Sequence, residues 1–292
     1  MTDILKQFES INIWKQGEQR APHKPLLILY ALGRWQRGLP EVTFLEAEPE
    51  LTDLLQRFGP QRKSNRPEQP FWRLQNDGVW AVQNPAGLPM KKGDDIPTVG
   101  ALRTPQVRAG FTPDVRAALT ADPSLVSKIA TSILEEHFPE SYHEDLLDAV
   151  GLVVQTAASL KKRDPMFRHR VLKAYEYRCA VCGFDVRIGT VSIALDAAHI
   201  RWHQAGGPDT EVNGLALCVM HHKVFDLGAF TVSDGVVLVS DLTNGSTGFQ
   251  EALMVFHGKP VRRAQHPDWK PEAMHLDWHL REVFKGQARH RG

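Results

Sequence analysis

The chain has 292 residues, is 42% hydrophobic and 24% charged, and carries a formal net charge of only +1. This length suggests two domains, and no segment approaches the ~20 consecutive apolar residues that a membrane-spanning helix needs. The first ten residues lack the basic and apolar segments of a secretory signal. An odd number of cysteines, three, favours a metal site in a reducing, cytoplasmic setting over a disulfide framework.

Residues 1–148 are expected to form one domain of mixed, mainly helical structure. The pattern changes once, where PFWRL and VWAV predict two short strands joined by a hairpin at Asn76-Asp77-Gly78. Elsewhere the spacing of apolar residues predicts helices over residues 3–16, 24–37, 41–59, 111–119 and 122–138.

Residues 149–292 are expected to form a second domain, which contains all three cysteines and ten of the thirteen histidines. Residues 148–178 predict a helix that ends in FRHRVLKAYEYR, just before the first cysteine. Residues 191–200, VSIALDAAHI, alternate as a strand, and GVVLVS near residue 237 predicts another strand. Asn213 is expected in a loop that runs into a helix. The fold class predicted for the whole chain is α+β.

Two Cys/His pairs have the spacing of a zinc site. Cys179 and Cys182 are separated by two residues, and so are Cys218 and His221. Two such pairs can complete the tetrahedral coordination of a structural Zn²⁺, which ties together segments whose core is small. The adjacent His222 is an alternative to His221 as the fourth ligand. Three free cysteines beside a surface histidine is the alternative interpretation.

A second set of polar residues lies inside the zinc pattern. Strand alternation places Asp196 and Ala198 on one face of the pleat and His199 on the other. His222 and Asp226 are four residues apart, so they share one face of a helix. If Asp196 points towards that helix, the three side chains can bind one divalent cation, Mg²⁺ or Mn²⁺, and leave positions open for phosphate and water.

This order of residues resembles the HNH, or ββα-metal, nuclease superfamily over residues 170–235. The resemblance implies that His199 is the general base that activates water, and that Asn213 fixes the loop that orients this base. It implies that His222 and Asp226 bind the catalytic metal. Many members have a metal-binding Asp or His just before the base, where this chain has Ala198; Asp196 is the substitute that we expect.

The first domain should deliver DNA to such a nuclease. The stretches Arg20–Trp35 and Arg66–Trp80 resemble the sulfur-binding domain of phosphorothioate-dependent restriction endonucleases. Sulfur in place of a phosphate oxygen calls for a small apolar cavity surrounded by cationic donors. Pro70, with Phe71 or Trp72, would supply the apolar walls, and Gln69 stands where an aromatic residue often precedes the proline. The expected donors and backbone contacts are Arg20, His23, Lys24, Arg66, Arg73, Arg103 and Arg108.

The sequence therefore predicts an endonuclease that recognises phosphorothioated double-stranded DNA and hydrolyses a phosphodiester bond nearby. It needs a structural Zn²⁺ and one catalytic divalent cation. Cutting both strands requires two active sites, so we expect a homodimer at least on DNA. Two alternatives are a nuclease that reads methylcytosine or hydroxymethylcytosine by base extrusion, and a zinc-stabilised DNA-binding regulator without enzymatic activity.

Overall fold

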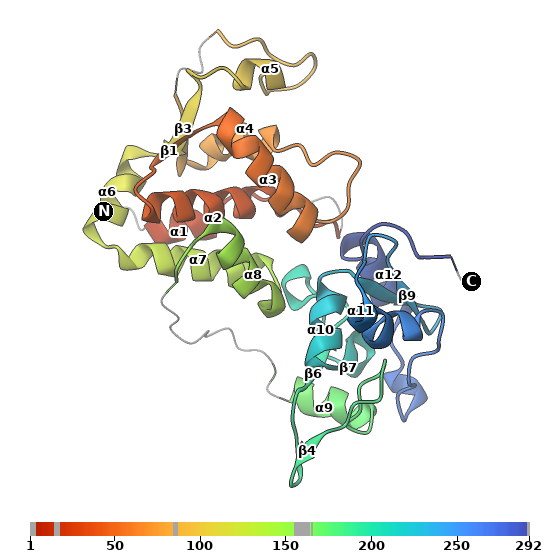
Figure 1. Cartoon of the computed structure of the whole chain (residues 1–292). Coiled ribbons are helices and arrows are strands. Elements are labelled where there is room, and N and C mark those ends of the chain that lie inside the picture. The colour runs from red at the N-terminus through yellow and green to blue at the C-terminus, as the bar shows by residue number, and fades with distance from the viewer. Residues whose placement is uncertain (1–3, 15–17, 84–86, 155–163, 165, 291–292) are drawn as a thin grey trace. The chain divides into compact units, whose positions relative to one another are not determined.

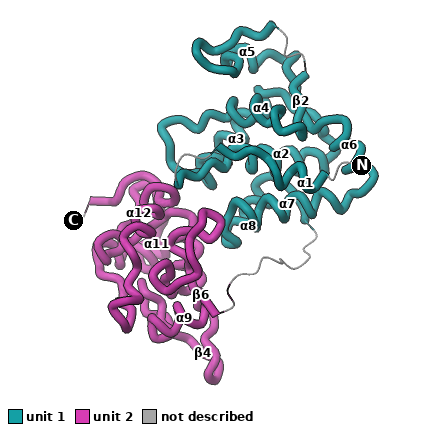
Figure 2. Tube along the Cα trace, turned by 180° about the vertical axis from the view of Figure 1, so that it is seen from behind, with its two compact units in different colours: residues 1–159 teal, residues 160–292 magenta. Residues whose placement is uncertain are grey.

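A computed structural model of the chain describes residues 4–14, 18–83, 87–154, 164 and 166–290. The chain divides into two compact units, residues 1–159 and residues 160–292 (Figure 2). The expected boundary at residues 148 and 149 lies inside a helix that packs on the first unit, so we propose that the functional boundary follows this helix. None of the helices in the described ranges is long and apolar enough to cross a bilayer.

The first unit is built around helix α2 (His23–Gln36), whose residues from Pro25 to Gly33 are buried. Every residue from Leu26 to Leu32 is buried, which is the pattern of a helix covered on all sides. Helices α3, α4, α7 and α8 pack around it (Figure 1). The other helices and turns of this unit are α1 (Ile4–Glu9), α3 (Phe44–Phe58), α4 (Glu68–Arg73), η1 (Leu74–Asp77), α5 (Val99–Leu102), α6 (Pro113–Ala121), α7 (Ser124–His137) and α8 (Glu140–Val150).

A small antiparallel sheet of three strands completes the first unit, in the order β1 (Glu41–Thr43), β3 (Arg108–Phe111) and β2 (Trp80–Val82). Helix α3 begins directly after β1 with a capping box: the Thr43 hydroxyl accepts from the Glu46 N–H, and the Glu46 carboxylate accepts from the Thr43 N–H. The helices predicted over 24–37, 41–59, 111–119 and 122–138 are confirmed within a few residues. The helix predicted over 3–16 is shorter, ending at Glu9, and residues 15–17 lie outside the described part.

The predicted hairpin at Asn76-Asp77-Gly78 is wrong. PFWRL forms helix α4 and the turn η1, and Gly78 ends that turn with a φ of 74°. Phe71 and Leu74 are both 0% exposed. Residues three apart share one face of a helix but lie on opposite faces of a strand, so a helix buries both side chains in one core. The strand VWAV exists as β2, but it pairs with β3, from residues about thirty positions later.

The second unit contains an antiparallel ribbon followed by a helix. Strand β6 (Leu195–His199) pairs with β7 (Gly214–Cys218), and α10 (Val219–Asp226) follows directly. Helix α9 (Phe167–Ala174) packs on both strands. The remaining elements are β4 (Arg187–Ile188), β5 (Val191–Ser192), η2 (His203–Ala205), η3 (Glu211–Asn213), β8 (Phe230–Ser233), β9 (Val236–Val239), α11 (Thr247–Ala252), η4 (Met254–Phe256), η5 (Pro267–Trp269) and α12 (Ala273–Glu282).

Two local predictions in this unit need correction. VSIALDAAHI is not one strand, because the backbone of Ala194 takes a φ of 52° and separates β5 from β6. Asn213 does not lead into a helix: strand β7 lies between Asn213 and α10, and its residues are buried on every position. The strand predicted near residue 237 is confirmed as β9. The α+β class holds for both units.

Candidate active site and DNA-reading pocket

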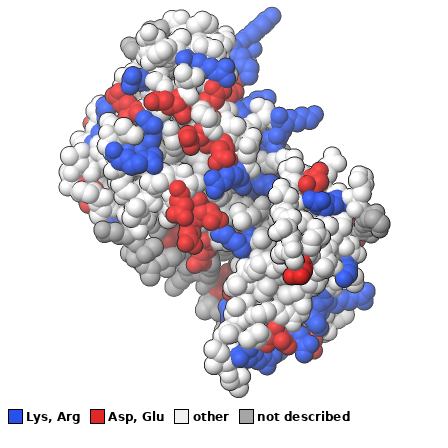
Figure 3. All heavy atoms as spheres, viewed as in Figure 1, with Lys and Arg blue, Asp and Glu red and all other residues white. Residues whose placement is uncertain are grey.

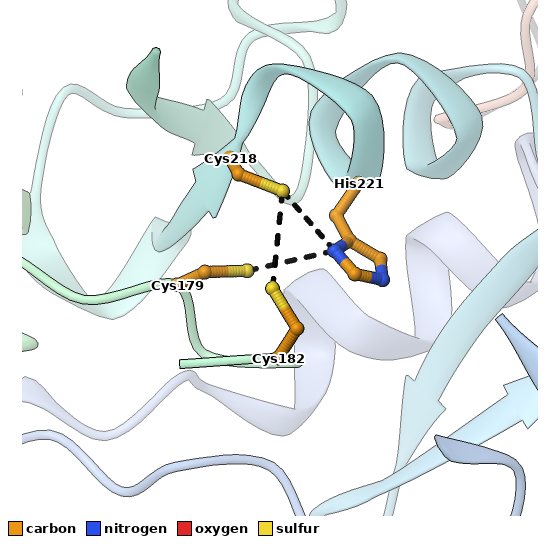
Figure 4. A group of neighbouring side chains, drawn as sticks. All are labelled: Cys179, Cys182, Cys218 and His221. Atoms are coloured by element: carbon orange, nitrogen blue, oxygen red, sulfur yellow. Dashed lines mark hydrogen bonds between the residues drawn. The ribbon is translucent and has the colours of Figure 1, made fainter. Parts of the chain in front are cut away.

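Three cysteines and one histidine converge beside the ribbon (Figure 4). Cys179 and Cys182 come from the turn after α9, Cys218 from the end of β7 and His221 from the first turn of α10. The sulfurs of Cys182 and Cys218 are 4.0 Å apart, and Nδ1 of His221 is 3.2 Å from Cys218 and 3.7 Å from Cys179. Ligands of one tetrahedral Zn²⁺ are separated by roughly 3.5–3.8 Å. The four ligand atoms lie within 4.8 Å of one another, close to this spacing, so the predicted side chains could hold a zinc ion.

The surroundings of His221 favour the same interpretation. Its Nε2 lies 3.0 Å from the carbonyl oxygen of Ala252. When Nε2–H donates to that carbonyl, Nδ1 keeps its lone pair and faces the cysteines, as in protein zinc sites. His222 does not compete for this position, because its ring contacts two carboxylates elsewhere.

The thiols influence one another strongly. Hydrogen bonds with Cys182 and Cys218 lower the pKa of the Cys179 thiol, and the contacts with Cys179 and Cys182 raise the pKa of Cys218. Burial lowers the pKa of His221, but the sulfurs of Cys179 and Cys182 outweigh burial and raise that pKa to about 9. A lowered thiol pKa favours the thiolate, which is the form that binds a metal, and binding of a cation would release the remaining protons.

His222 on α10 lies between two carboxylates. Its Nδ1 is 3.3 Å from Oδ2 of Asp196 on β6, and its Nε2 is 3.3 Å from Oδ2 of Asp226. Burial lowers the pKa of His222, but Asp226 and Asp196 outweigh burial and raise that pKa to about 10. A cation that binds this ring must therefore displace a proton. Ala198 is fully buried and has no ligand atom. The carboxylate of strand β6 that contacts α10 belongs to Asp196.

The two carboxylates are not equivalent. They face opposite ring nitrogens, so a cation bound to one nitrogen of His222 has only one of them beside it. The side chain of Asp196 is 40% exposed, whereas that of Asp226 is 4% exposed. Asp196 and Nδ1 therefore form the open side. Asp226 contacts Nε2 from the buried side of the ring; the three-residue ligand set that we expected stays a prediction.

His199 ends strand β6 and is held by an acid that sequence reasoning missed. Its Nε2 lies 2.7 Å from Oδ1 of Asp209, and the ring stacks on Phe167 of α9 at 4.1 Å between centroids. Nδ1 of His203 is 3.3 Å from the same carboxylate oxygen. Burial raises the pKa of Asp209, but the N–H of Asp164 and the ring of His199 outweigh burial and lower it. His199, His203 and Asp209 also form a group with metal-ligand spacing.

Asn213 acts on the loop rather than on the ring of His199. Its Nδ2 donates to the carbonyl oxygens of Arg201 and Pro208 at 2.9 and 3.0 Å, and its Oδ1 accepts from the N–H of Arg201 at 2.8 Å. Asn213 is completely buried, so it fixes the loop between β6 and η3 from inside. Asp209, near the end of that loop, contacts His199 directly.

The first unit contains a pocket of about 910 Å³. Most of the residues that the sequence nominated for DNA contact line it: Arg20, His23, Lys24, Arg66, Gln69, Pro70 and Arg73. Sequence reasoning missed Arg62 and Trp14 in its wall; Trp14 is 56% exposed. Residues separated by up to eighty positions thus form one site, open to a ligand.

Several of the expected cations already have acidic partners in the pocket. Nζ of Lys24 lies 2.6 Å from Asp77, and the guanidinium of Arg73 contacts Asp94 at 2.7 Å and also Asp95. Burial lowers the pKa of His23 and outweighs the hydrogen bond to the Asn65 carbonyl, so this ring is protonated less readily than a free histidine. On the face drawn in Figure 3, basic and acidic side chains are likewise interspersed.

The other nominated residues lie elsewhere. Phe71 is fully buried in the core, and the indole N–H of Trp72 donates to the carbonyl oxygen of Asp95 at 3.0 Å. Arg103 makes two hydrogen bonds of 2.7 Å to Glu48, and Arg108 is exposed on β3. These four do not line the pocket. Pro70 is therefore the apolar wall that remains from the expected set.

Comparison with known proteins gives this geometry a context. A family model described as ScoMcrA-like, DNA sulfur-binding domain, matches residues 1–155, more than half of the chain. The chain belongs to this family. A second model, described as HNH endonuclease, matches residues 179–233, so the sulfur-binding domain is followed by an HNH domain and the chain is a DNA endonuclease. HNH nucleases depend on metal ions.

Solved structures that resemble the chain include the sulfur-binding domain of ScoMcrA complexed with phosphorothioated DNA, with 21% identity over 52% of this chain and 97% of that one, and a TM-score of 0.46. The type IV phosphorothioation-dependent restriction endonuclease ScoMcrA shows 20% identity over 57% of this chain and 38% of its own, with a TM-score of 0.44. The modification-dependent restriction endonuclease TagI shows 28% identity over 45% and 41%, with a TM-score of 0.29. The comparison with curated proteins gave no match.

Proposed function

We propose that the protein is a modification-dependent restriction endonuclease that recognises phosphorothioated DNA and hydrolyses a phosphodiester bond nearby. The observation that carries this proposal is the pair of imidazole–carboxylate groups on strand β6 of the HNH domain. Asp196 lies against His222 near the start of the strand, and His199 lies against Asp209 at its end. The first group suits a cation and the second suits a general base.

In this proposal, Asp196 and Nδ1 of His222 bind one divalent cation, and Asp226 orients the His222 ring from the buried side. A bound cation of this kind polarises the scissile phosphate and stabilises the leaving oxygen. Cys179, Cys182, Cys218 and His221 bind a separate structural Zn²⁺ that fixes the start of α10, and with it His222.

His199 takes a proton from the attacking water in this scheme. The positive charge that develops on its ring is stabilised by Asp209, whose carboxylate lies 2.7 Å from Nε2. The stacked ring of Phe167 keeps the imidazole in one plane. Asn213 keeps the loop, and therefore Asp209, in place.

The pocket of the sulfur-binding domain would accept the modified phosphate. Sulfur is larger and less strongly hydrated than oxygen, so contact with the ring carbons of Pro70 costs it little desolvation. The remaining oxygens of the phosphate need donors, and Arg20, Arg62 and Arg66 stand around the pocket. Arg73 would have to exchange Asp94 for the phosphate. The aromatic wall of Trp14 also suits a modified base, so methylcytosine is the second ligand to test.

Cleavage of one plasmid prepared with and without sulfur in its backbone tests the proposal. We expect cutting of the sulfur-containing plasmid with Mg²⁺ or Mn²⁺, and none after chelation or in His199→Ala. A methylated plasmid without sulfur serves as the competing substrate. Equal cutting of the sulfur-free plasmid would contradict the reading of sulfur, and preferred cutting of the methylated plasmid would assign the pocket to a base.

Two finer points belong to the same proposal. Cutting of both strands would need two chains on one DNA site, which mass measurements with and without the sulfur-containing duplex would detect. A cytoplasmic location is also proposed, because three cysteines that serve as metal ligands must stay reduced.

A further inference from the structure

Helix α9 has two different faces. Its inner face carries Phe167, which stacks on His199. Its outer face carries His169 and Lys173, which are exposed and one helical turn apart. No acidic residue occurs from Met166 to Tyr175. This outer face therefore carries basic side chains and no acidic one, on the same helix whose inner face contacts His199.

This basic face continues onto a neighbouring hairpin through Tyr177. The hydroxyl of Tyr177 lies 3.3 Å from Nδ1 of His169. The guanidinium of Arg187, on strand β4, lies over the Tyr177 ring, 5.8 Å from its centroid. Neither Lys173 nor Arg187 has an acidic partner in the part of the chain that the structure describes. These cations are thus available to a ligand from outside.

The tip of the β4–β5 hairpin is apolar and exposed. Ile188 and Val191 face each other in the register, and they are 70% and 64% exposed. Gly189, with a φ of 59°, allows the tight turn between them. Figure 3 shows this tip in white, with basic and acidic side chains next to it. Two large β-branched side chains at a protruding turn, in the same unit as a nuclease site, form an unusual solvent surface.

We propose that Lys173, His169, Tyr177, Arg187 and the tip residues Ile188 and Val191, together the hairpin face, bind the duplex next to the scissile phosphate. This inference rests on the proposed nuclease function. Lys173 and Arg187 contact backbone phosphates, which position a protein on DNA without reading its sequence. The tip enters the minor groove, where apolar side chains wedge between base steps and open them.

Charge supports DNA rather than a second protein chain as the occupant. From Phe167 to Ser192 there are five Lys and Arg residues and two acidic ones. Both acidic residues are already paired, Asp185 with Arg178 at 3.6 Å and Glu176 with Arg262 at 3.5 Å. Arg170 is also paired, with Asp164 and Glu211, so the cations without an acidic partner among the described residues are Arg168, Lys173 and Arg187. They stand beside the apolar tip, which matches a polyanion with stacked bases inside.

The test compares two double variants of the full chain, Lys173→Gln/Arg187→Gln and Ile188→Ser/Val191→Ser. Lys259→Gln/Lys270→Gln, on exposed positions of the same unit, is the control for charge, and Leu242→Ser, at an exposed leucine, is the control for the tip. Binding is measured on a long phosphorothioated duplex and on a short one that reaches only the sulfur-binding domain. Step opening is followed by 2-aminopurine fluorescence in the long duplex.

We expect the charge variant to bind the long duplex more weakly, with a salt dependence whose slope falls by about 0.9 for each lost phosphate contact. The tip variant should keep that slope and lose the 2-aminopurine signal. Both should bind the short duplex as the wild type does, which also shows that they are folded. Cleavage of the long duplex should show a raised KM.

Three results would overturn the proposal. One is an unchanged slope in the charge variant together with an unchanged 2-aminopurine signal in the tip variant. Another is an equal loss in the control variants. The third is loss of self-association in the tip variant, which would assign the face to a second copy of the chain. Failure of the wild type to cut any DNA would instead contradict the proposed function. The two failures can be distinguished, because the binding measurements do not depend on cleavage.

Discussion

The contact between His199 and Asp209 leads to the sharpest prediction. In Asp209→Asn the amide keeps the size of the side chain but loses its negative charge. Both side chains are only 15% exposed, so water replaces this interaction poorly. A hydrogen bond to a charged group contributes about 1.5–3 kcal/mol, which corresponds to a rate factor of about 10 to 150. We expect kcat to fall by this factor while KM stays the same.

The assay is cleavage of phosphorothioated duplex under saturating cation, followed by a cation titration at fixed substrate. His199→Ala should lose more, about 100- to 10,000-fold, because it removes the base itself. Asp234→Asn, at an exposed turn between β8 and β9, is the matched control and should behave as the wild type. Combining Asp209→Asn with His199→Ala should cause little further loss, because Asp209 acts through the ring.

The titration decides between two roles for Asp209. A positioning residue changes the maximal rate but not the cation concentration at half-maximal rate. His199, His203 and Asp209 have the spacing of metal ligands, so a marked rise in that concentration would mean that Asp209 binds the ion. That outcome would refute the positioning role of Asp209. A fall in kcat of less than about threefold in Asp209→Asn would also refute it, because a factor of 10 or more is expected.

Three further predictions concern stability and loop geometry. Cys179→Ser, or a strong chelator, should lower the melting temperature of the HNH domain alone; calorimetry should show the transition of the sulfur-binding domain unchanged, and a shift of both would contradict separate units. Gly207→Ala should reduce cleavage more than tenfold without affecting DNA binding. A Cβ at residue 207 would lie 1.9 Å from the Arg201 carbonyl oxygen and 2.8 Å from Nδ2 of Asn213, so the loop would have to shift. Gly248→Ala is the control, because nothing lies within 4 Å of a Cβ at that position. Lys24→Ala should lower the free energy of unfolding in urea by about 3 kcal/mol, the lower end of the range for a broken buried ion pair. The lower end is expected because the Asp77 carboxylate still accepts a hydrogen bond from the N–H of Asn12. A change below about 1 kcal/mol, as for an exposed pair, would contradict burial of this ion pair.

The two side-chain groups around Cys179 and around His222 could be predicted because the residues of each group are separated by short, fixed spacings; the ions that they bind stay predictions. Cys179 and Cys182, or His222 and Asp226, have fixed relative positions once the local structure is known. Ala198 in place of a ligand also pointed correctly to Asp196 as the strand carboxylate beside His222. The position of Asp226 around the His222 ring could not be predicted. The ring nitrogen that Asp226 faces depends on how α10 packs on β6.

Contacts between distant segments could not be read from the sequence. Asp209 contacts His199 across a loop that Asn213 holds by hydrogen bonds to Arg201 and Pro208. No periodicity of apolar residues in the sequence predicts the course of such a loop. In the sulfur-binding domain, the sequence nominated Arg73 and Arg103 as donors, but their partners Asp94 and Glu48 are 21 and 55 residues away. The hairpin error has the same origin: Asn-Asp-Gly is a strong local turn signal, yet burial of Phe71 and Leu74 in one core decided for a helix.

His221 and His222 are neighbours in the chain, yet they serve different centres. One ring points to the cysteine cluster and the other to the carboxylates of Asp196 and Asp226. Oxidation of the thiols would release the first turn of α10, and the imidazole one residue further would lose its register with β6. If the thiols hold zinc and His222 holds the catalytic cation, as proposed, oxidants would slow DNA cutting and leave DNA binding by the first domain unchanged.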